Sequence, residues 1–191
     1  MRENINKEIF KIKIKNTNCY IHQGLSNLNP DVVASYRLSK DKINFKFNNH
    51  LKLGISKHSI TTFNSQNTTW FEAAVPLLYL PSTCTMRATD IWRSFIAIRI
   101  LKLNSINVLF SGPSVFQKRN YHSLIADFKD EATMYINNKK MMEILNHTKL
   151  KKGYNNLSTN LVLCYEALIK NGFFEKKEII HLKAWLKDCQ N

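Results

Sequence analysis

Three charged residues interrupt an otherwise apolar stretch in the middle of the chain. Arg87, Asp90 and Arg93 stand three positions apart in the run RATDIWR, which opens a long apolar segment. A buried charge costs free energy unless it is paired, so two explanations compete. Asp90 can lie in the first turn of a helix, where the helix dipole favours an anion, and pair with either arginine. Alternatively, the three residues form a functional site, where ionisable groups are often held in unusual surroundings.

The second candidate is an uncharged polar stretch, TTFNSQNTTW, at residues 61–70. Amide and hydroxyl side chains of this kind can bind sugar hydroxyls, and Asn64, Ser65 and Asn67 are the candidates. The same composition is typical of a surface loop in which Asn67 or Thr68 caps a short helix. Both interpretations stay open at the level of the residues.

Motifs for several other chemistries are missing from the sequence. It contains no HxH, HExxH or GxSxG motif, no glycine-rich phosphate loop and no Asp-X-Asp pair. The four cysteines, Cys19, Cys84, Cys164 and Cys189, include no CxxC spacing. This arrangement argues against a zinc site and favours a reducing compartment.

The charge of the chain is strongly positive. Its 28 Lys and Arg against 14 Asp and Glu give a formal charge of +14. Such an excess can attract nucleic acid, an anionic membrane or a phosphorylated substrate. The basic residues are scattered, however, and lack the interleaved aromatics of a single-strand binding surface. An AT-rich coding sequence also enriches Lys, Asn and Ile. We therefore predict that nucleic acid is not a partner.

The elements that must position these residues follow from hydrophobic periodicity. Alternation or β-branched content predicts strands at residues 9–15, 19–23, 43–47, 59–63, 75–80 and 106–110. Helices are predicted from Pro30 to residue 36, over 86–103, over 157–170 and over the stretch that carries Ile179, Leu182, Trp185 and Leu186. The helix at 86–103 is apolar on nearly every side and should be buried. Strands, a central helix and a helical end predict a single α/β or α+β domain over residues 1–191.

Four stretches of the sequence resemble STELLO glycosyltransferases, in the same order along the chain. They are QGLSN with PDV at residues 23–32, FNSQNT at 63–68, LPSTCTMRATDIWRS at 80–94, and GFF with AWL at 172–186. Each stretch alone is a weak signal, but the collinear set spans most of the chain. STELLO proteins are in turn similar to the reversibly glycosylated polypeptides, which are UDP-arabinopyranose mutases.

This resemblance implies a fold, a reaction and a set of site residues. The fold would be a partial A-type glycosyltransferase fold, Rossmann-like, with a helical C-terminal segment. The reaction would transfer a sugar from a nucleotide sugar to a carbohydrate acceptor. In such folds an acidic residue at the start of a helix near the acceptor serves as the base, and Asp90 matches that position. The implied substrate contacts are Arg87, Arg93, Asn64, Ser65, Asn67, Trp92 and Asp31.

Part of the family pattern is missing from this chain. The nucleotide-binding strands and the Asp-X-Asp pair that would hold Mn²⁺ or Mg²⁺ with the donor are missing, so this chain matches the acceptor side. A separate chain could supply the nucleotide-binding half. The alternatives are a catalytically inactive remnant or a binding module that acts with a partner glycosyltransferase. With no signal peptide or transmembrane segment evident, we expect a cytoplasmic location.

Overall fold

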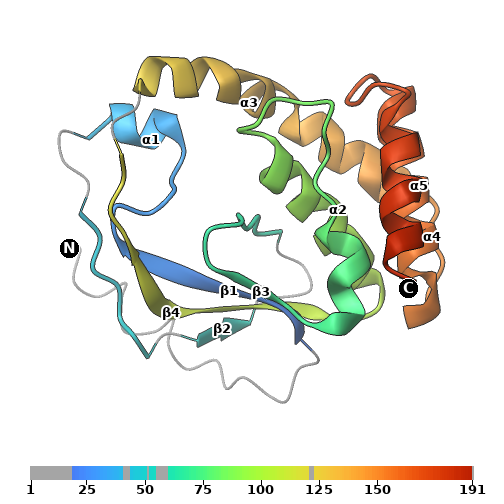
Figure 1. The fold of residues 1–191 in the computed structure, drawn as a ribbon, viewed down its shortest axis with the longest axis horizontal. Helices are drawn as coiled ribbons and strands as arrows, with labels where there is room; N and C mark the ends of the chain where they lie inside the picture. Colours follow the sequence, from blue (N-terminus) through green and yellow to red (C-terminus); the bar gives the residue numbers. More distant parts are fainter. Residues whose placement is uncertain (1–18, 41–43, 51, 55–59, 121–122, 191) are drawn as a thin grey trace.

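A four-stranded mixed sheet forms one side of the molecule (Figure 1). The computed structural model describes residues 19–40, 44–50, 52–54, 60–120 and 123–190. The strands are β1 (Cys19–Leu28), β2 (Lys52–Gly54), β3 (Thr68–Trp70) and β4 (Asn107–Gln117), in the spatial order β2-β4-β1-β3. β1 and β4 are parallel, while β2 and β3 pair antiparallel on the outside. The predicted mixed α/β class is therefore confirmed.

The longer helices gather above and beside the sheet in Figure 1. The helical elements are α1 (Ala34–Leu38), the 3₁₀ helix η2 (Glu72–Leu78), α2 (Thr89–Leu103), α3 (Leu124–His147), the 3₁₀ turn η3 (Tyr154–Asn156), α4 (Leu157–Lys170) and α5 (Glu178–Asp188). α2 packs on β4, α3, α4 and η2, so it is the centre of the helical layer.

The sequence of α2 explains its central place. Trp92, Phe95, Ile96, Ile100 and Leu101 are all buried, and together they point in nearly every direction around the helix. A helix that is apolar all round must be covered on all sides. The predicted buried helix is confirmed, although it begins at Thr89 rather than at residue 86.

The two C-terminal helices also follow the predicted pattern. α4 ends before Gly172, whose φ of 79° lies in the left-handed region that glycine adopts without steric cost. The N–H of Phe173 then bonds the carbonyl of Leu168 at 3.0 Å and turns the chain back. α5 buries Leu182 and Leu186 on the face that its periodicity predicts.

The parallel pair is longer than its sequence pattern suggests. The strands predicted at 19–23 and 106–110 extend to Leu28 and Gln117, beyond the turn-like residues that were expected to end them. Gly24 pairs with Ser111 and Ser26 with Val115, so the ladder is irregular where Pro113 lies. A bulge of this kind accommodates a proline, which has no N–H to donate.

Other predicted elements are wrong or lie outside the described residues. Residues 75–80 belong mainly to the 3₁₀ helix η2 instead of a strand, and residues 60–63 form no strand. The first helix begins at Ala34, because the backbone of Asp31 is bonded to the side chains of Asn64 and Gln66 instead. α3, the longest helix, was not predicted. Residues 9–15 and Ile43 lie outside the described part of the chain, and Phe45 makes an isolated antiparallel bridge with Leu28.

Candidate functional site

Two adjoining hollows lie beyond the carboxyl ends of β1 and β4. The carboxyl ends of parallel strands meet at one edge of a sheet, which is where open α/β folds bind ligands. The first hollow has a volume of about 250 Å³, and its lining includes Asp31, Asn64, Ser65, Arg87, Asp90 and Glu131. The second has a volume of about 430 Å³ and is lined by Asp31, Ser65, Gln66, Arg87, Asp90, Gln117, Arg119 and Asn120. We call the two together the edge pocket.

Asp90 enters the edge pocket from the first turn of α2. Its Oδ2 atom accepts a hydrogen bond of 3.0 Å from the backbone N–H of Ser65. Among the described residues, no ion pair joins Asp90 to Arg87 or Arg93. The alternative of a direct ion pair within the helix is therefore not seen: Arg87 pairs with Asp31 and Asp127, and Arg93 bonds to Ser65.

The surroundings of Asp90 shift its acidity upward. Burial raises the pKa of Asp90, while the hydrogen bond from Ser65 and the positive charge of Arg93 act in the opposite direction. The result is a pKa above the usual carboxyl value. A carboxylate with a raised pKa is a stronger base, and it lines a pocket that a ligand can enter.

Arg93 lies beneath Asp90 and does not line the edge pocket. Its side chain is 3% exposed, and its guanidinium lies 4.8 Å from the ring centre of Trp70. Nη2 donates a 3.0 Å hydrogen bond to the Ser65 hydroxyl, whereas the buried Nε has no hydrogen-bond partner. Burial lowers the pKa of Arg93, and Asp90 opposes this shift. Arg93 therefore fixes Ser65 by a hydrogen bond, and Ser65 in turn fixes Asp90.

Four charged side chains from four parts of the fold form a quartet of ion pairs. Arg119 Nη1 lies 2.7 Å from Asp31 Oδ1, and Arg119 Nη2 lies 3.6 Å from Asp127 Oδ2. Arg87 pairs with Asp127 and lies 3.7 Å from Asp31. Both arginines therefore share both aspartates. Arg119 and Asp127 were not among the candidates predicted from the sequence, because no spacing links them to Arg87.

The polar stretch at 61–70 supplies the rim of the edge pocket. Asn64 donates to the carbonyl of Asp31 at 3.2 Å, and the Gln66 side chain accepts from the N–H of Asp31 at 3.1 Å. Thr68 donates to the carbonyl of Asn64 at 2.6 Å and begins β3. The alternative in which Asn67 or Thr68 caps a helix is therefore wrong, because these residues lead into a strand.

Two predicted site residues lie elsewhere. Asn67 donates to the carbonyl of Leu25 and to the hydroxyl of Ser114, at 2.8 and 3.0 Å, and does not line the edge pocket. Trp92 is 2% exposed, contacts Phe173 and Phe174 edge-on, and donates its indole N–H to Asn138. The structure thus brings together Asp31, Asn64, Ser65, Arg87 and Asp90, with Arg93 behind them, and places Asn67 and Trp92 apart.

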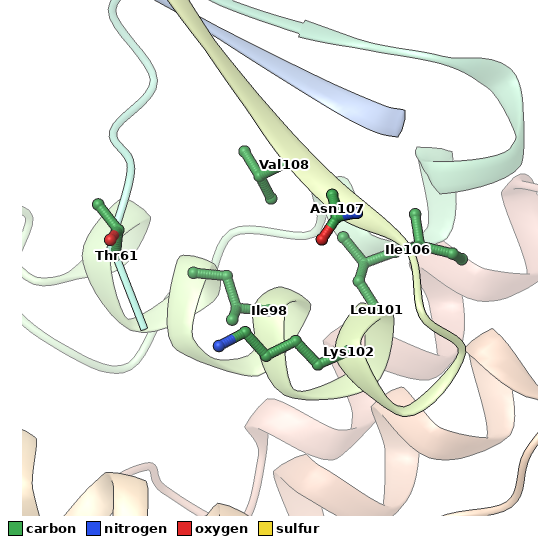
Figure 2. Close-up of a pocket in the computed structure, with 7 residues that line it drawn as sticks. All are labelled: Thr61, Ile98, Leu101, Lys102, Ile106, Asn107 and Val108. Atoms are coloured by element: carbon green, nitrogen blue, oxygen red, sulfur yellow. The ribbon is translucent and has the colours of Figure 1, made fainter. Parts of the chain in front are cut away.

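A small apolar hollow between α2 and β4 is unsuited to a sugar. Figure 2 shows the residues that line it, which are Thr61, Ile98, Leu101, Lys102, Ile106, Asn107 and Val108. Its volume of about 10 Å³ has room for roughly one water molecule. It is a small gap in the packing between α2 and the sheet, and its apolar lining differs from that of the polar edge pocket.

The described residues offer neither a cluster of metal ligands nor a membrane-spanning helix. Within the described residues, no three His, Cys, Asp or Glu side chains gather into a group that could hold a metal ion. None of the helices in the described part of the chain combines the length and apolar character needed to cross a membrane. All four cysteines are free thiols.

The fold and the edge pocket define a mixed α/β protein whose polar pocket lies at the carboxyl edge of a parallel strand pair. Residues 87–191, more than half of the chain, match the family model of STELLO glycosyltransferases. The chain therefore belongs to the STELLO glycosyltransferase family. This confirms the resemblance seen in the sequence, and the matched region includes Arg87, Asp90, Arg93, Arg119 and Asp127.

Two plant proteins are similar to almost the whole chain. Probable glycosyltransferase STELLO2 of Arabidopsis thaliana is 25% identical over 189 residues, which cover 96% of this chain and 24% of that protein. Probable glycosyltransferase STELLO1 of the same plant is 23% identical over the same coverage. The chain thus spans about a quarter of the length of the curated relatives that it matches.

Proposed function

We propose that this chain forms the acceptor-side part of a glycosyltransferase, which transfers a sugar from a nucleotide sugar to a carbohydrate acceptor in polysaccharide biosynthesis. Membership of the STELLO family supports the reaction class. The edge pocket supports the acceptor assignment, since uncharged polar side chains such as Asn64, Ser65 and Gln66 line it.

The observation that carries the proposal is the placement of Asp90. Its carboxylate lines the pocket, is fixed by the N–H of Ser65 and has a raised pKa. We assign Asp90 as the base that removes the proton from the attacking hydroxyl of the acceptor. A base of this kind must lie within hydrogen-bond reach of that hydroxyl, and removing it typically costs a factor of about 10² to 10⁴ in rate.

The neighbours of Asp90 have supporting roles in this proposal. Asn64 and Ser65 would contact acceptor hydroxyls at the rim, with Asp31 and Arg87 further along the pocket. Arg93 would act through Ser65 and Asp90, because its guanidinium is buried beneath them. Trp92 and Asn67 are left without a substrate contact, since neither lines the pocket.

The arrangement of β1, α2 and β4 supports a Rossmann-like, A-type glycosyltransferase fold as the finer assignment. α2 leads into β4, and β4 lies parallel to β1, as in a crossover unit. We propose that these elements form the acceptor half of that fold. The helical layer built from α3, α4 and α5 would be its C-terminal segment.

The nucleotide sugar would be bound by a different part of the enzyme, supplied by a separate chain or by further sequence. The relatives are about four times as long as the matched region, which leaves ample sequence for donor binding. A divalent cation such as Mn²⁺ or Mg²⁺ would neutralise the donor diphosphate. The described residues do not fit such a cation, so no step of this proposal passes through one.

The substitution Asp90→Asn tests the assignment of the base. It keeps size and polarity but removes the proton acceptor, so sugar transfer should fall about 100-fold or more. Folding should lose about 0.3–1 kcal/mol at most, the favourable term of an anion at a helix N-terminus. Transfer from a panel of UDP-sugars is measured for the purified chain and for extracts of cells that express it, so that any partner is present.

Asp130→Asn is the matched control, because it makes the same charge change on α3 at an exposed position outside the pocket. It should leave transfer unchanged. A large fall in melting temperature for Asp90→Asn, relieved by Arg87→Met or Arg93→Met, would contradict the proposal. Asp90 would then be the structural partner of a buried arginine, and the chain a binding module.

A further inference from the structure

The edge pocket carries no surplus positive charge, although the chain has a formal charge of +14. Its ionisable lining residues are Asp31, Asp90, Glu131, Arg87 and Arg119, three acids against two bases. Behind them Asp127 pairs with both arginines, and Arg93 lies beneath Asp90. The buried Arg37 also interacts with the charges of Asp31, Arg87, Arg119 and Asp127, so the whole group carries four negative and four positive charges. The basic character of the protein is therefore concentrated elsewhere.

Both arginines of the pocket are already neutralised within the protein. Arg119 is held by Asp31 at 2.7 Å and by Asp127 at 3.6 Å, and its side chain is 11% exposed. Arg87 is held by the same two carboxylates. An arginine that binds phosphate or carboxylate uses its planar fork of N–H donors, and here those donors face internal carboxylates.

The N-terminus of α2 also disfavours an anionic ligand. The first turn of a helix attracts anions, because its backbone N–H groups and the helix dipole both favour negative charge. In this chain Asp90 already provides a carboxylate in that turn, with Ser65 bound to it. A second anion at this place would meet the repulsion of Asp90.

We propose that the quartet of Asp31, Arg87, Arg119 and Asp127 is a specificity device that restricts the edge pocket to uncharged carbohydrates. Neutral hydroxyl groups bind to its amide, hydroxyl and backbone groups, whereas sugars that carry a phosphate or a carboxylate are rejected. The inference rests on the proposed function in naming a sugar as the ligand. The neutralisation of the arginines can be tested independently of that function.

The physical basis is the cost of breaking the quartet. An anion that reaches Arg119 must either displace Asp31 or approach it closely, and like charges in contact repel each other more strongly near a protein surface than in water. A hydroxyl group pays no such cost. It can also donate to Asp31, which is 41% exposed and keeps acceptor capacity toward solvent.

The test uses inorganic phosphate as the probe and follows the amide resonances of Ser65, Arg87 and Asn120 by NMR. The wild-type chain should show weak phosphate effects at these amides. Asp31→Asn removes one negative charge from an exposed position and keeps the size of the side chain. It should increase phosphate affinity at these amides about tenfold, which corresponds to about 1.4 kcal/mol.

Asp127→Asn is the second variant and should have the same effect on phosphate affinity, while Asp130→Asn is the charge-matched control on the same helix. A gain in either folded variant, without a gain in the control, supports the proposal. It is overturned if neither variant gains affinity, if the control gains as much, or if the wild-type chain already binds as tightly as the variants.

A second arm separates this inference from the proposed function. Glucose, glucuronate and glucose 6-phosphate are titrated as a matched set that differs at one carbon, and the same comparison is made for galactose and mannose. Neutral sugars should shift the pocket amides of the wild-type chain, and their charged counterparts should do so at least tenfold more weakly. Equal binding of charged and neutral sugars overturns the inference. If no sugar binds while Asp31→Asn gains phosphate affinity, the acceptor assignment fails and the neutralisation of the arginines stands.

Discussion

Ser65 is the residue that connects the two charges of α2. Its N–H donates to Asp90, and its hydroxyl accepts from Arg93, so a loop residue bridges two positions of one helix. This explains how a carboxylate and a guanidinium three residues apart can be close without a direct ion pair. It also makes the position of the base depend on the loop at 64–67.

Replacing Arg93 should change the pH dependence of transfer. The positive charge of Arg93 lowers the pKa of Asp90, against the larger raising effect of burial. In Arg93→Met that opposing effect is lost, so the pKa of Asp90 rises further. Since a base works only when ionised, the acid limb of the pH–rate profile should move to higher pH.

Arg93→Lys is the control for this prediction, because it retains the charge while losing the fork that holds Ser65. Its acid limb should stay near that of the wild-type chain. An acid limb that is the same in Arg93→Met and in the wild-type chain would contradict the electrostatic role of Arg93, even if the variant were less stable.

Sequence reasoning found about half of the edge pocket at the residue level. Asp90, Arg87 and the polar stretch were predicted because each departs from the pattern around it. Arg119 and Asp127 could not be predicted, since the contact of Arg119 with Asp31 joins positions 88 apart and depends on the pairing of β1 with β4. Trp92 was a candidate only through the family resemblance, and burial of a large aromatic ring in the core is the commoner outcome.

At the scale of elements, α5 is anchored through its first residue. Glu178 is fully buried, and its carboxylate accepts from the N–H groups of Ser82 and Thr83 and from the hydroxyl of Tyr79. Burial by itself would raise the pKa of Glu178, but the hydrogen bonds from Thr83, Tyr79 and Ser82 outweigh it and lower that pKa. The segment that leads into α2 is therefore tied to the last helix. Ser82 and Thr83, which belong to the stretch at residues 80–94 that resembles STELLO glycosyltransferases, therefore have a structural role.

Glu178→Gln should destabilise the protein strongly. The new amide places N–H₂ against N–H and O–H donors, and a lost hydrogen bond to a charged group costs about 1.5–3 kcal/mol. We expect a loss of about 2–4 kcal/mol in the free energy of unfolding, measured by urea denaturation at neutral pH. Because the folded pKa of Glu178 lies below its usual value, this contribution should be present near neutral pH and be lost as the pH falls below about 4.5.

Glu175→Gln is the matched control for this measurement. Its carboxylate is exposed and pairs at 3.0 Å with Lys177, which is also exposed, so the change should cost less than about 0.5 kcal/mol. If Glu178→Gln proves no more destabilising than Glu175→Gln, the carboxylate does not anchor the helix.

Long apolar or clearly periodic segments were predicted well, and the other elements were not. α4 and α5 each carry one apolar stripe at helical spacing, α2 is a long run that is apolar on nearly every side, and all three helices are present. α3 was missed because its apolar residues fall on two faces, with Met134, Met141 and Leu145 buried and Ile125, Phe128 and Ile136 exposed. Residues 75–80, predicted as a strand, belong mainly to η2, and Pro76 lies inside that 3₁₀ helix. Short apolar runs do not distinguish a strand from a helix, so the conformation of residues 75–80 depends on their packing in the fold.

At the scale of the whole molecule, the net charge of the chain differs from the charge of the edge pocket. The chain is strongly basic, yet its edge pocket is close to neutral, so the overall charge does not describe the ligand. The prediction that nucleic acid is not a partner stays a prediction. Phosphate-dominated binding would require accessible cations, and those of the pocket are held by aspartates.

The central claim is that the edge pocket binds a carbohydrate acceptor, and the most direct test is a sugar titration of the isotope-labelled chain followed by NMR. Neutral oligosaccharides should shift the amides of Asn64, Ser65, Arg87 and Asp90 together. A UDP-sugar with Mn²⁺ should have little effect on the chain alone, because no metal-binding group lies among the described residues. Oligosaccharides that leave these amides unmoved, or UDP-sugar binding at micromolar concentration, would contradict the account.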